Sequence, residues 1–231
     1  MNWYRIARIS LLLMLLAALV LLATKPVTSN LVGVTEQPAP RQQSAAPSPQ
    51  DLILIWTAIA DQPYPGLPFL TKNGDAHAAT KRKSVVLLDR STQTCTGARA
   101  KQMCASSLDQ EMLSGSAVDA FVSTQAREAL ILANASQVTV RLPDSNYVRG
   151  APTATVDALL VGVNWAAFYK AFPGTAGYLQ LSVPVLIDGG SHALVYAEQR
   201  CDGLCGTGTL YLLSRAGNRW KITNGLVLWV S

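Results

Sequence analysis

The chain beyond residue 178 constrains the fold most, because apolar runs alternate there with short turn signals. The turns are Asp188-Gly189-Gly190, a Cys-Gly loop and Ala216-Gly217-Asn218, and the runs cover residues 178–187, 193–199, 209–214 and 220–230. Connections this short permit only antiparallel pairing of consecutive strands. The sequence therefore predicts a carboxy-terminal antiparallel meander of four or more strands.

The part of the chain before the meander predicts helices that cover its apolar face. Leu52, Ile55, Trp56 and Ile59 recur at helical spacing after Asp51, a residue type that caps helices. Further patterns predict a buried strand over 84–90, a helix from Ser116 to about Asn134 that opens with a capping box, a strand over 137–142 and a helix over 165–172. Residues 51–231 are thus expected to form one α+β domain.

Two segments of different composition precede this domain. Residues 26–50 contain five prolines among Ser, Ala, Gln and Thr, which predicts a disordered linker. In residues 1–25, Arg5 and Arg8 precede an apolar run from Leu11 to Ala23, which predicts a hydrophobic helix that directs export. Its length fits both a signal peptide and an amino-terminal membrane anchor, so the exported domain is either soluble in the periplasm or tethered to the inner membrane.

The charge of the exported part argues against nucleic-acid binding. The chain has a net charge of +5, but three of its 19 cationic residues lie before Pro26 whereas all 14 acidic residues follow it, which leaves +2. The run Lys81-Arg82-Lys83 is the densest basic segment, and it is interpreted as a solvated flank of the strand that follows, with contact to an anionic surface as the alternative. No nucleic-acid partner is expected.

Four cysteines in an exported protein favour disulfides. The closeness of the cysteines in sequence predicts Cys95–Cys104 and Cys201–Cys205, although four cysteines allow three pairings. A four-cysteine zinc site is the alternative, but the gap between Cys95 and Cys104 is a poor match to zinc knuckles. Cys201 and Cys205 have one intervening residue too many for a thioredoxin-type redox motif.

A set of ordered signatures in the last third of the chain resembles a known family. They are Trp165, Phe168-Tyr169, Phe172-Pro173 and Gly177, then Ser182, Ala193-Leu-Val-Tyr196, Cys201-Asp-Gly-Leu-Cys205-Gly206-Thr-Gly208, Trp220 and Ile222. This pattern is similar to a family of uncharacterised secreted or periplasmic bacterial proteins over residues 159–231, and more loosely over residues 85–130. The resemblance implies one recurring domain and no particular activity.

The residues that carry catalytic chemistry are sparse. Ser182, His192 and Asp188 are the one triad that the predicted elements allow, and no G-x-S-x-G elbow accompanies them. His77 has no motif around it. Acidic residues at metal-ligand spacing are absent, so neither a metal nor a cofactor is expected.

The Cys-Gly loop is the best candidate for binding. Gly203, Gly206 and Gly208 predict a tight connection with positive φ, and a rigid loop at a sheet edge often carries a binding site. The aromatic residues of the 165–172 helix are interpreted as core. Asn134-Ala-Ser136 matches a glycosylation acceptor, which has meaning only in a eukaryotic secretory pathway.

These observations predict a function of binding rather than catalysis. The hypothesis is a cell-envelope interaction domain, stabilised by disulfides, that binds another envelope protein. The alternatives are a secreted hydrolase that uses Ser182 and His192, and a structural component of an envelope assembly.

Overall fold

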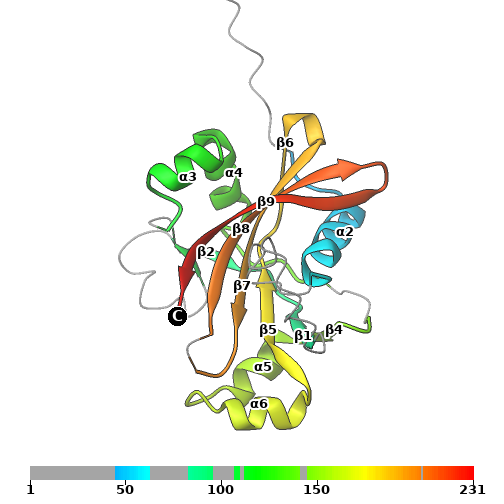
Figure 1. Ribbon diagram of the computed structural model, residues 1–231, viewed down its shortest axis with the longest axis vertical. Coiled ribbons are helices and arrows are strands. Elements are labelled where there is room, and N and C mark those ends of the chain that lie inside the picture. The colour runs from blue at the N-terminus through cyan, green and yellow to red at the C-terminus, as the bar shows by residue number, and fades with distance from the viewer. Residues whose placement is uncertain (1–44, 63–82, 96–106, 110–111, 141–144, 204) are drawn as a thin grey trace, which may run out of the picture. The chain divides into compact units, whose positions relative to one another are not determined.

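The computed structural model describes residues 45–62, 83–95, 107–109, 112–140, 145–203 and 205–231 (Figure 1). The predicted export helix, most of the predicted linker, His77, Lys81-Arg82 and Cys104 lie outside these ranges. Within the described ranges, no helix has both the length and the apolar character that a membrane span requires.

A mixed sheet forms the centre of the fold. Its strand order is β4 (Val148–Ala151), β1 (Ser84–Leu88), β5 (Thr175–Leu181), β7 (His192–Arg200), β8 (Thr207–Ala216) and β9 (Arg219–Val230), and β6 (Val185–Ile187) also pairs with β7. The β5, β7, β8 and β9 strands pair antiparallel, whereas β1 pairs in parallel with both β4 and β5. The α+β class is therefore confirmed, and the predicted meander is extended by two parallel strands.

The predicted strand over 178–187 is interrupted. Leu181 pairs with Ala197 and Val185 pairs with Leu194, so three residues, 182–184, lie opposite two residues of β7. This is a β-bulge, and it separates β5 from β6. Pro184 explains part of the interruption, because proline has no N–H to donate to a strand ladder.

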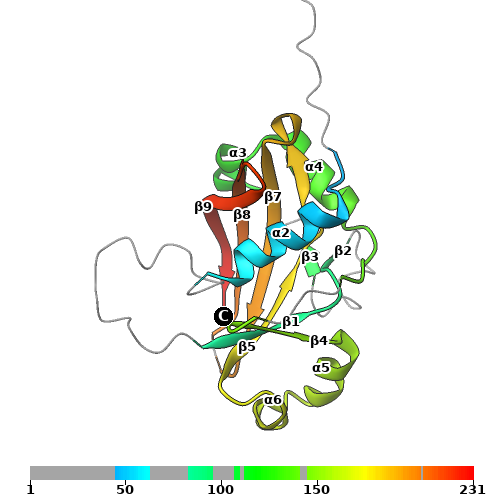
Figure 2. The same cartoon turned by 90° about the vertical axis from the view of Figure 1, so that its right-hand side faces the viewer.

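Helix α2 (Pro49–Ala60) covers one face of the sheet. It begins earlier than predicted, because the Ser48 hydroxyl rather than Asp51 accepts the capping hydrogen bond, from the Asp51 N–H at 3.1 Å. Trp56 and Ile59 are fully buried against the residues of β5, β7 and β8 that point to this face. Figure 2 shows α2 lying across the strands.

Among the described residues, four helices cover the opposite face. The predicted helix over 116–134 is two helices, α3 (Ser116–Phe121) and α4 (Thr124–Ala133), since Val122 is extended and Ser123 caps α4. The predicted capping box at Ser116 is wrong, because Gly115 occupies the N-cap position without a side-chain bond. Helices α5 (Thr153–Leu159) and α6 (Trp165–Ala171) pack near the other end of this face, around Phe168.

Three further elements complete the description. A small parallel sheet pairs β2 (Gln93–Cys95) with β3 (Ser107–Asp109), and η3 (Asp188–Gly190) connects β6 to β7. The predicted strand over 137–142 is wrong for its described part, where Thr139 makes an isolated bridge to Arg90. The sequence patterns do not predict the nearby elements β4 and α5. These are positioned through Asp89, whose carboxylate accepts from the Thr153 N–H at 2.8 Å.

Candidate functional site

Ser182 lies in the core at the bulge between β5 and β6. Its side chain is fully buried, and its Oγ accepts a hydrogen bond from the Tyr196 N–H at 2.8 Å. The Ser182 carbonyl accepts from Trp56 Nε1 at 3.0 Å. The hydroxyl therefore repairs the strand ladder where the extra residue interrupts it.

Asn134 holds the same bulge from the other face of the sheet. Its Oδ1 accepts from the Val183 N–H at 2.7 Å, and its Nδ2 donates to the carbonyls of Leu130 and Val183 at 2.8 and 3.1 Å. The side chain is fully buried, so in this fold Asn134 is a structural residue and is not accessible as a glycosylation acceptor.

The predicted triad is not assembled. His192 Nδ1 lies 3.1 Å from Asp188 Oδ2 and 3.1 Å from Ser191 Oγ, in the exposed turn that contains η3. Ser182, by contrast, bonds to Tyr196, which is four residues further along β7 and so about 13 Å away. The structure brings His192 and Asp188 together and leaves Ser182 apart from them.

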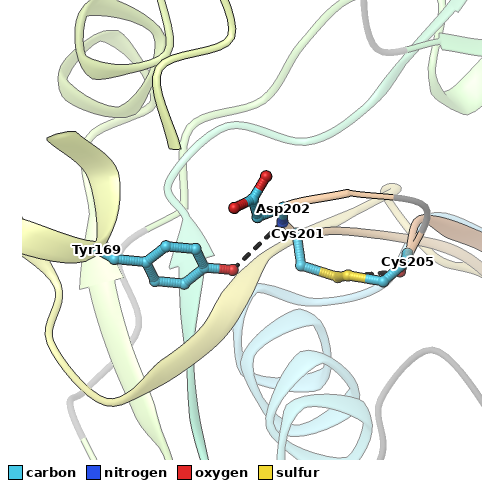
Figure 3. Close-up of a disulfide and its surroundings, with 4 residues drawn as sticks. All are labelled: Tyr169, Cys201, Asp202 and Cys205. Carbon is cyan, nitrogen blue, oxygen red and sulfur yellow. Dashed lines mark hydrogen bonds between the residues drawn. A yellow bond between two sulfur atoms is a disulfide. The ribbon is translucent and has the colours of Figure 1, made fainter. Parts of the chain in front are cut away.

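The predicted disulfide between Cys201 and Cys205 is present. It closes the connection from β7 to β8, with Cα atoms 5.6 Å apart. Figure 3 shows the Tyr169 hydroxyl of α6 directed at this loop, where it accepts from the Asp202 N–H at 3.3 Å. Cys201 and Cys205 are thus held by a covalent bond, and Asp202 is held by contact with a helix. The predicted Cys95–Cys104 pair lies outside the described residues.

The three glycines of this loop have two different roles. Gly203 has a φ of +73°, as predicted for a tight connection. Gly206 and Gly208 do not have positive φ, and they are small because Trp229 of β9 packs on them. A Cβ at Gly208 would come 2.0 Å from Trp229 Nε1, and a Cβ at Gly206 would come 3.0 Å from the same ring.

A charged cluster lies beside this loop, and we call it the Arg200 cluster. Glu198 is 1% exposed and pairs with Arg200 Nε, while 40% of the Arg200 side chain remains exposed. The guanidinium lies 5.2 Å from the centre of the Trp229 ring, and Trp229 Nε1 donates to the Tyr196 hydroxyl at 2.9 Å. The cluster therefore runs from a buried carboxylate to a half-exposed cation.

Burial perturbs the acidic groups of this cluster. It raises the pKa of Glu198 above its usual value, and the attraction of Arg200 offsets this effect only in part. Tyr178 of β5 pairs with Arg200 across the sheet, and burial, assisted by the negative charge of Glu198, raises its pKa to about 12. The same two causes raise the pKa of Tyr196. Groups perturbed in this way gather at functional sites more often than elsewhere.

A second cluster that combines an arginine, a tryptophan and a carboxylate lies near the β8–β9 turn, and we call it the Arg215 cluster. Arg215 stacks 4.5 Å from the Trp220 ring centre and donates from Nη2 to Asp51 at 2.8 Å. Its Nε donates to the Gly190 carbonyl at 3.2 Å, and Trp220 Nε1 donates to Asp51 at 3.2 Å. These bonds tie α2, η3 and the hairpin together.

Sequence patterns point to the Cys-Gly loop and not to the charged cluster beside it. Glu198 lies within the 193–199 run that predicts a strand and Arg200 follows it directly, and their alternation is the signal that places both on one face. Trp165 and Phe168 lie in an aromatic cluster with Tyr178, as expected for core residues. In the part of the chain that the structure describes, no three His, Cys, Asp or Glu residues are arranged to hold a metal ion.

Comparisons with protein-family models, with curated proteins and with solved structures find no match for this chain.

Proposed function

We propose that this chain is an exported bacterial cell-envelope protein whose α+β domain binds a partner through the end of the sheet that carries the Cys201–Cys205 loop. The observation that carries the proposal is the Arg200 cluster, where a half-exposed guanidinium rests on an indole beside a loop closed by a disulfide. Arginine and tryptophan dominate the binding energy of many protein interfaces. The export segment and the family resemblance described from the sequence support the same assignment.

The rigidity of this end of the domain favours binding. The disulfide and the Tyr169–Asp202 bond hold the loop, so little conformational freedom is lost when a partner contacts it. The chain enters the domain at the opposite end, where Ala45 exchanges backbone hydrogen bonds with Leu186 of β6 (Figure 1). Leu186 pairs with Ala193, seven residues before Arg200 and so about 23 Å away along β7. The loop therefore lies at the end of β7 away from the residue at which the described domain begins.

Site-specific photo-crosslinking in cells tests this proposal. We expect a photoreactive residue at Asp202 to capture one discrete protein, and the same residue at Asn218, in the exposed β8–β9 turn, to capture none. Many captured proteins at both positions would favour the alternative of a structural component in an envelope assembly. Equal, background capture at both positions would contradict a binding role for the loop.

The disulfide provides a second test of the loop. Replacement of Cys201 and Cys205 by alanine removes a short cross-link, and we expect a loss of about 2 kcal/mol in the free energy of unfolding together with weaker capture at Asp202. Unchanged folding and unchanged capture would remove the loop from the proposed binding surface.

A further inference from the structure

We propose that the outer edge of the Arg200 guanidinium is a recognition site for a carboxylate group. This assignment deepens the proposed binding function and rests on it. It predicts the chemical class of the ligand, which is an oxyanion of low charge that the partner presents next to the Cys201–Cys205 loop.

The first argument is the unused hydrogen-bonding capacity of Arg200. Its Nε is paired with Glu198, and within the described ranges its two terminal nitrogens have no hydrogen-bond partner. With 40% of the side chain exposed, these nitrogens can be reached from solvent. Two parallel N–H groups match the two oxygens of a carboxylate, which makes this geometry specific as well as strong.

The second argument is that the guanidinium is held in place before any ligand arrives. Glu198 fixes its inner edge, and the Trp229 ring lies against it. Trp229 is itself held by the Tyr196 hydroxyl and by the space that Gly206 and Gly208 leave. A cation fixed in this way loses little side-chain entropy on binding, and binding is stronger for that reason.

The third argument concerns the energy of the Glu198–Arg200 pair. A carboxylate that is 1% exposed has lost nearly all its hydration, and such pairs add little stability compared with apolar residues of the same size. Stability therefore does not account for a buried charge at this position. A recognition role does, because Glu198 positions the guanidinium and leaves its outer edge free.

The local charge selects the class of ligand. Glu198 already compensates Arg200, and Asp202, exposed in the adjacent loop, adds a further negative charge. A ligand with two negative charges would be repelled by these groups, whereas a carboxylate with one charge is repelled less and still engages both terminal nitrogens.

A titration of the full-length chain in detergent micelles tests the site. The probes are N-acetylglycine, which has a carboxylate, N-acetylglycinamide, which lacks it, and inorganic phosphate. We expect N-acetylglycine to shift the Arg200 side-chain signals in NMR spectra of arginine-labelled protein, and the amide to leave them unchanged. Equal shifts with the acid and the amide, or tighter binding of phosphate than of the acid, would overturn the assignment.

Three variants separate recognition from structure. Arg200→Lys keeps the charge and loses the planar fork, so the Kd for N-acetylglycine should rise about tenfold or more. Glu198→Gln keeps a side-chain oxygen that can accept from Arg200 Nε, so the guanidinium stays in place, and it removes a negative charge beside the guanidinium, so the Kd should fall about threefold. Arg215→Lys is the matched control and should leave the Kd unchanged, and urea unfolding checks that each variant is folded. An unchanged Kd in a folded Arg200→Lys variant would refute the proposal.

Crosslinking at Asp202 in the Arg200→Lys background identifies the source of the carboxylate. Loss of the captured protein means that the partner presents the group, and retained capture with lost N-acetylglycine binding means that a small molecule does. Either result supports the site. If the unsubstituted chain captures no protein but binds N-acetylglycine, the proposed interaction function fails while the site stands. If it captures a protein and does not bind the acid, the site fails alone.

Discussion

The Arg200 and Arg215 clusters contain the same three kinds of side chain and use them differently. In the Arg215 cluster, Asp51 accepts from Arg215, Trp220 and Ser48, and these bonds join three elements. In the Arg200 cluster, the carboxylate lies inside and the outer edge of the guanidinium faces solvent. Arg215 bonds to protein acceptors through both Nε and Nη2 and its side chain is 35% exposed, whereas Arg200 bonds through Nε alone and its side chain is 40% exposed. Within the described ranges Arg200 therefore leaves both terminal nitrogens for a ligand, and Arg215 leaves one.

The two carboxylates also differ in the direction of their pKa shifts. Hydrogen bonding from Arg215 is the main reason that the pKa of Asp51 is lowered, so its charged form is stabilised by the fold. Burial is the main reason that the pKa of Glu198 is raised, so its charged form is tolerated rather than favoured. The fold therefore favours the charged carboxylate in the Arg215 cluster, whereas burial opposes the charge of the carboxylate in the Arg200 cluster.

Asp51→Ala, in the Arg215 cluster, should cause the largest loss in the free energy of unfolding. The substitution removes the acceptor for Arg215 and Trp220, and it removes a negative charge from the first turn of α2. We therefore expect the free energy of unfolding, measured by urea denaturation, to fall by about 3 kcal/mol. Asp157→Ala, at an exposed position of α5, is the control and should change the free energy by less than about 0.5 kcal/mol. Equal effects of the two substitutions would mean that the Arg215 cluster is not structural.

The next effect should come from Gly208→Ala. Its Cβ would overlap Trp229, which must move, so we expect a loss of about 2 kcal/mol and a weaker Trp229–Arg200 contact, seen as altered Arg200 side-chain signals. Gly217→Ala, in the β8–β9 turn, meets no neighbouring atom within 4 Å and should cost about 1 kcal/mol, from its positive φ alone. If Gly208→Ala left the Arg200 signals unchanged, Trp229 would not be what positions the guanidinium.

A smaller effect is expected from pH, with opposite signs for the two clusters. Between its raised folded-state pKa and the ordinary value of 4.5, Glu198 binds a proton in the folded protein only, so stability rises as pH falls through this window. Asp51 has the opposite effect below pH 3.8. The stability that its charged form adds to the folded protein is lost as pH falls through its lowered pKa. Urea unfolding against pH measures both, and the rise on mild acidification should disappear in Glu198→Gln. A rise that persists in this variant would assign it to another group.

The smallest change in stability should follow the double substitution Glu198→Leu with Arg200→Met. Apolar side chains of similar size replace an ion pair whose carboxylate is buried, so the free energy of unfolding should stay the same or increase. Calorimetry or urea unfolding measures this directly. A loss of more than about 2 kcal/mol would show that the pair stabilises the fold and would remove the contrast between the clusters.

Sequence patterns predicted the parts of the fold that rest on local signals. The meander followed from turn residues such as Gly189 and Gly217, and the Cys201–Cys205 disulfide followed from close spacing. Two details have a signal that is partly local: Pro184 interrupts the strand at the Ser182 bulge, and the Ser123 side chain caps α4 by accepting from the Ala126 N–H. The bond from the Val183 N–H to Asn134, which holds the bulge, is tertiary and has no local signature. The candidate site was partly predictable: the loop was visible in its glycines, but the burial of Glu198 and the packing of Trp229 on Gly208 depend on three paired strands.

One paired measurement tests the central claim that the Arg200 cluster serves binding and the Arg215 cluster serves the fold. Arg200→Lys and Arg215→Lys are each measured for the free energy of unfolding in urea and for the Kd of N-acetylglycine. The account predicts weaker binding with unchanged stability for Arg200→Lys, and lower stability with unchanged binding for Arg215→Lys. The reverse pattern, or the same pattern in both variants, would contradict it.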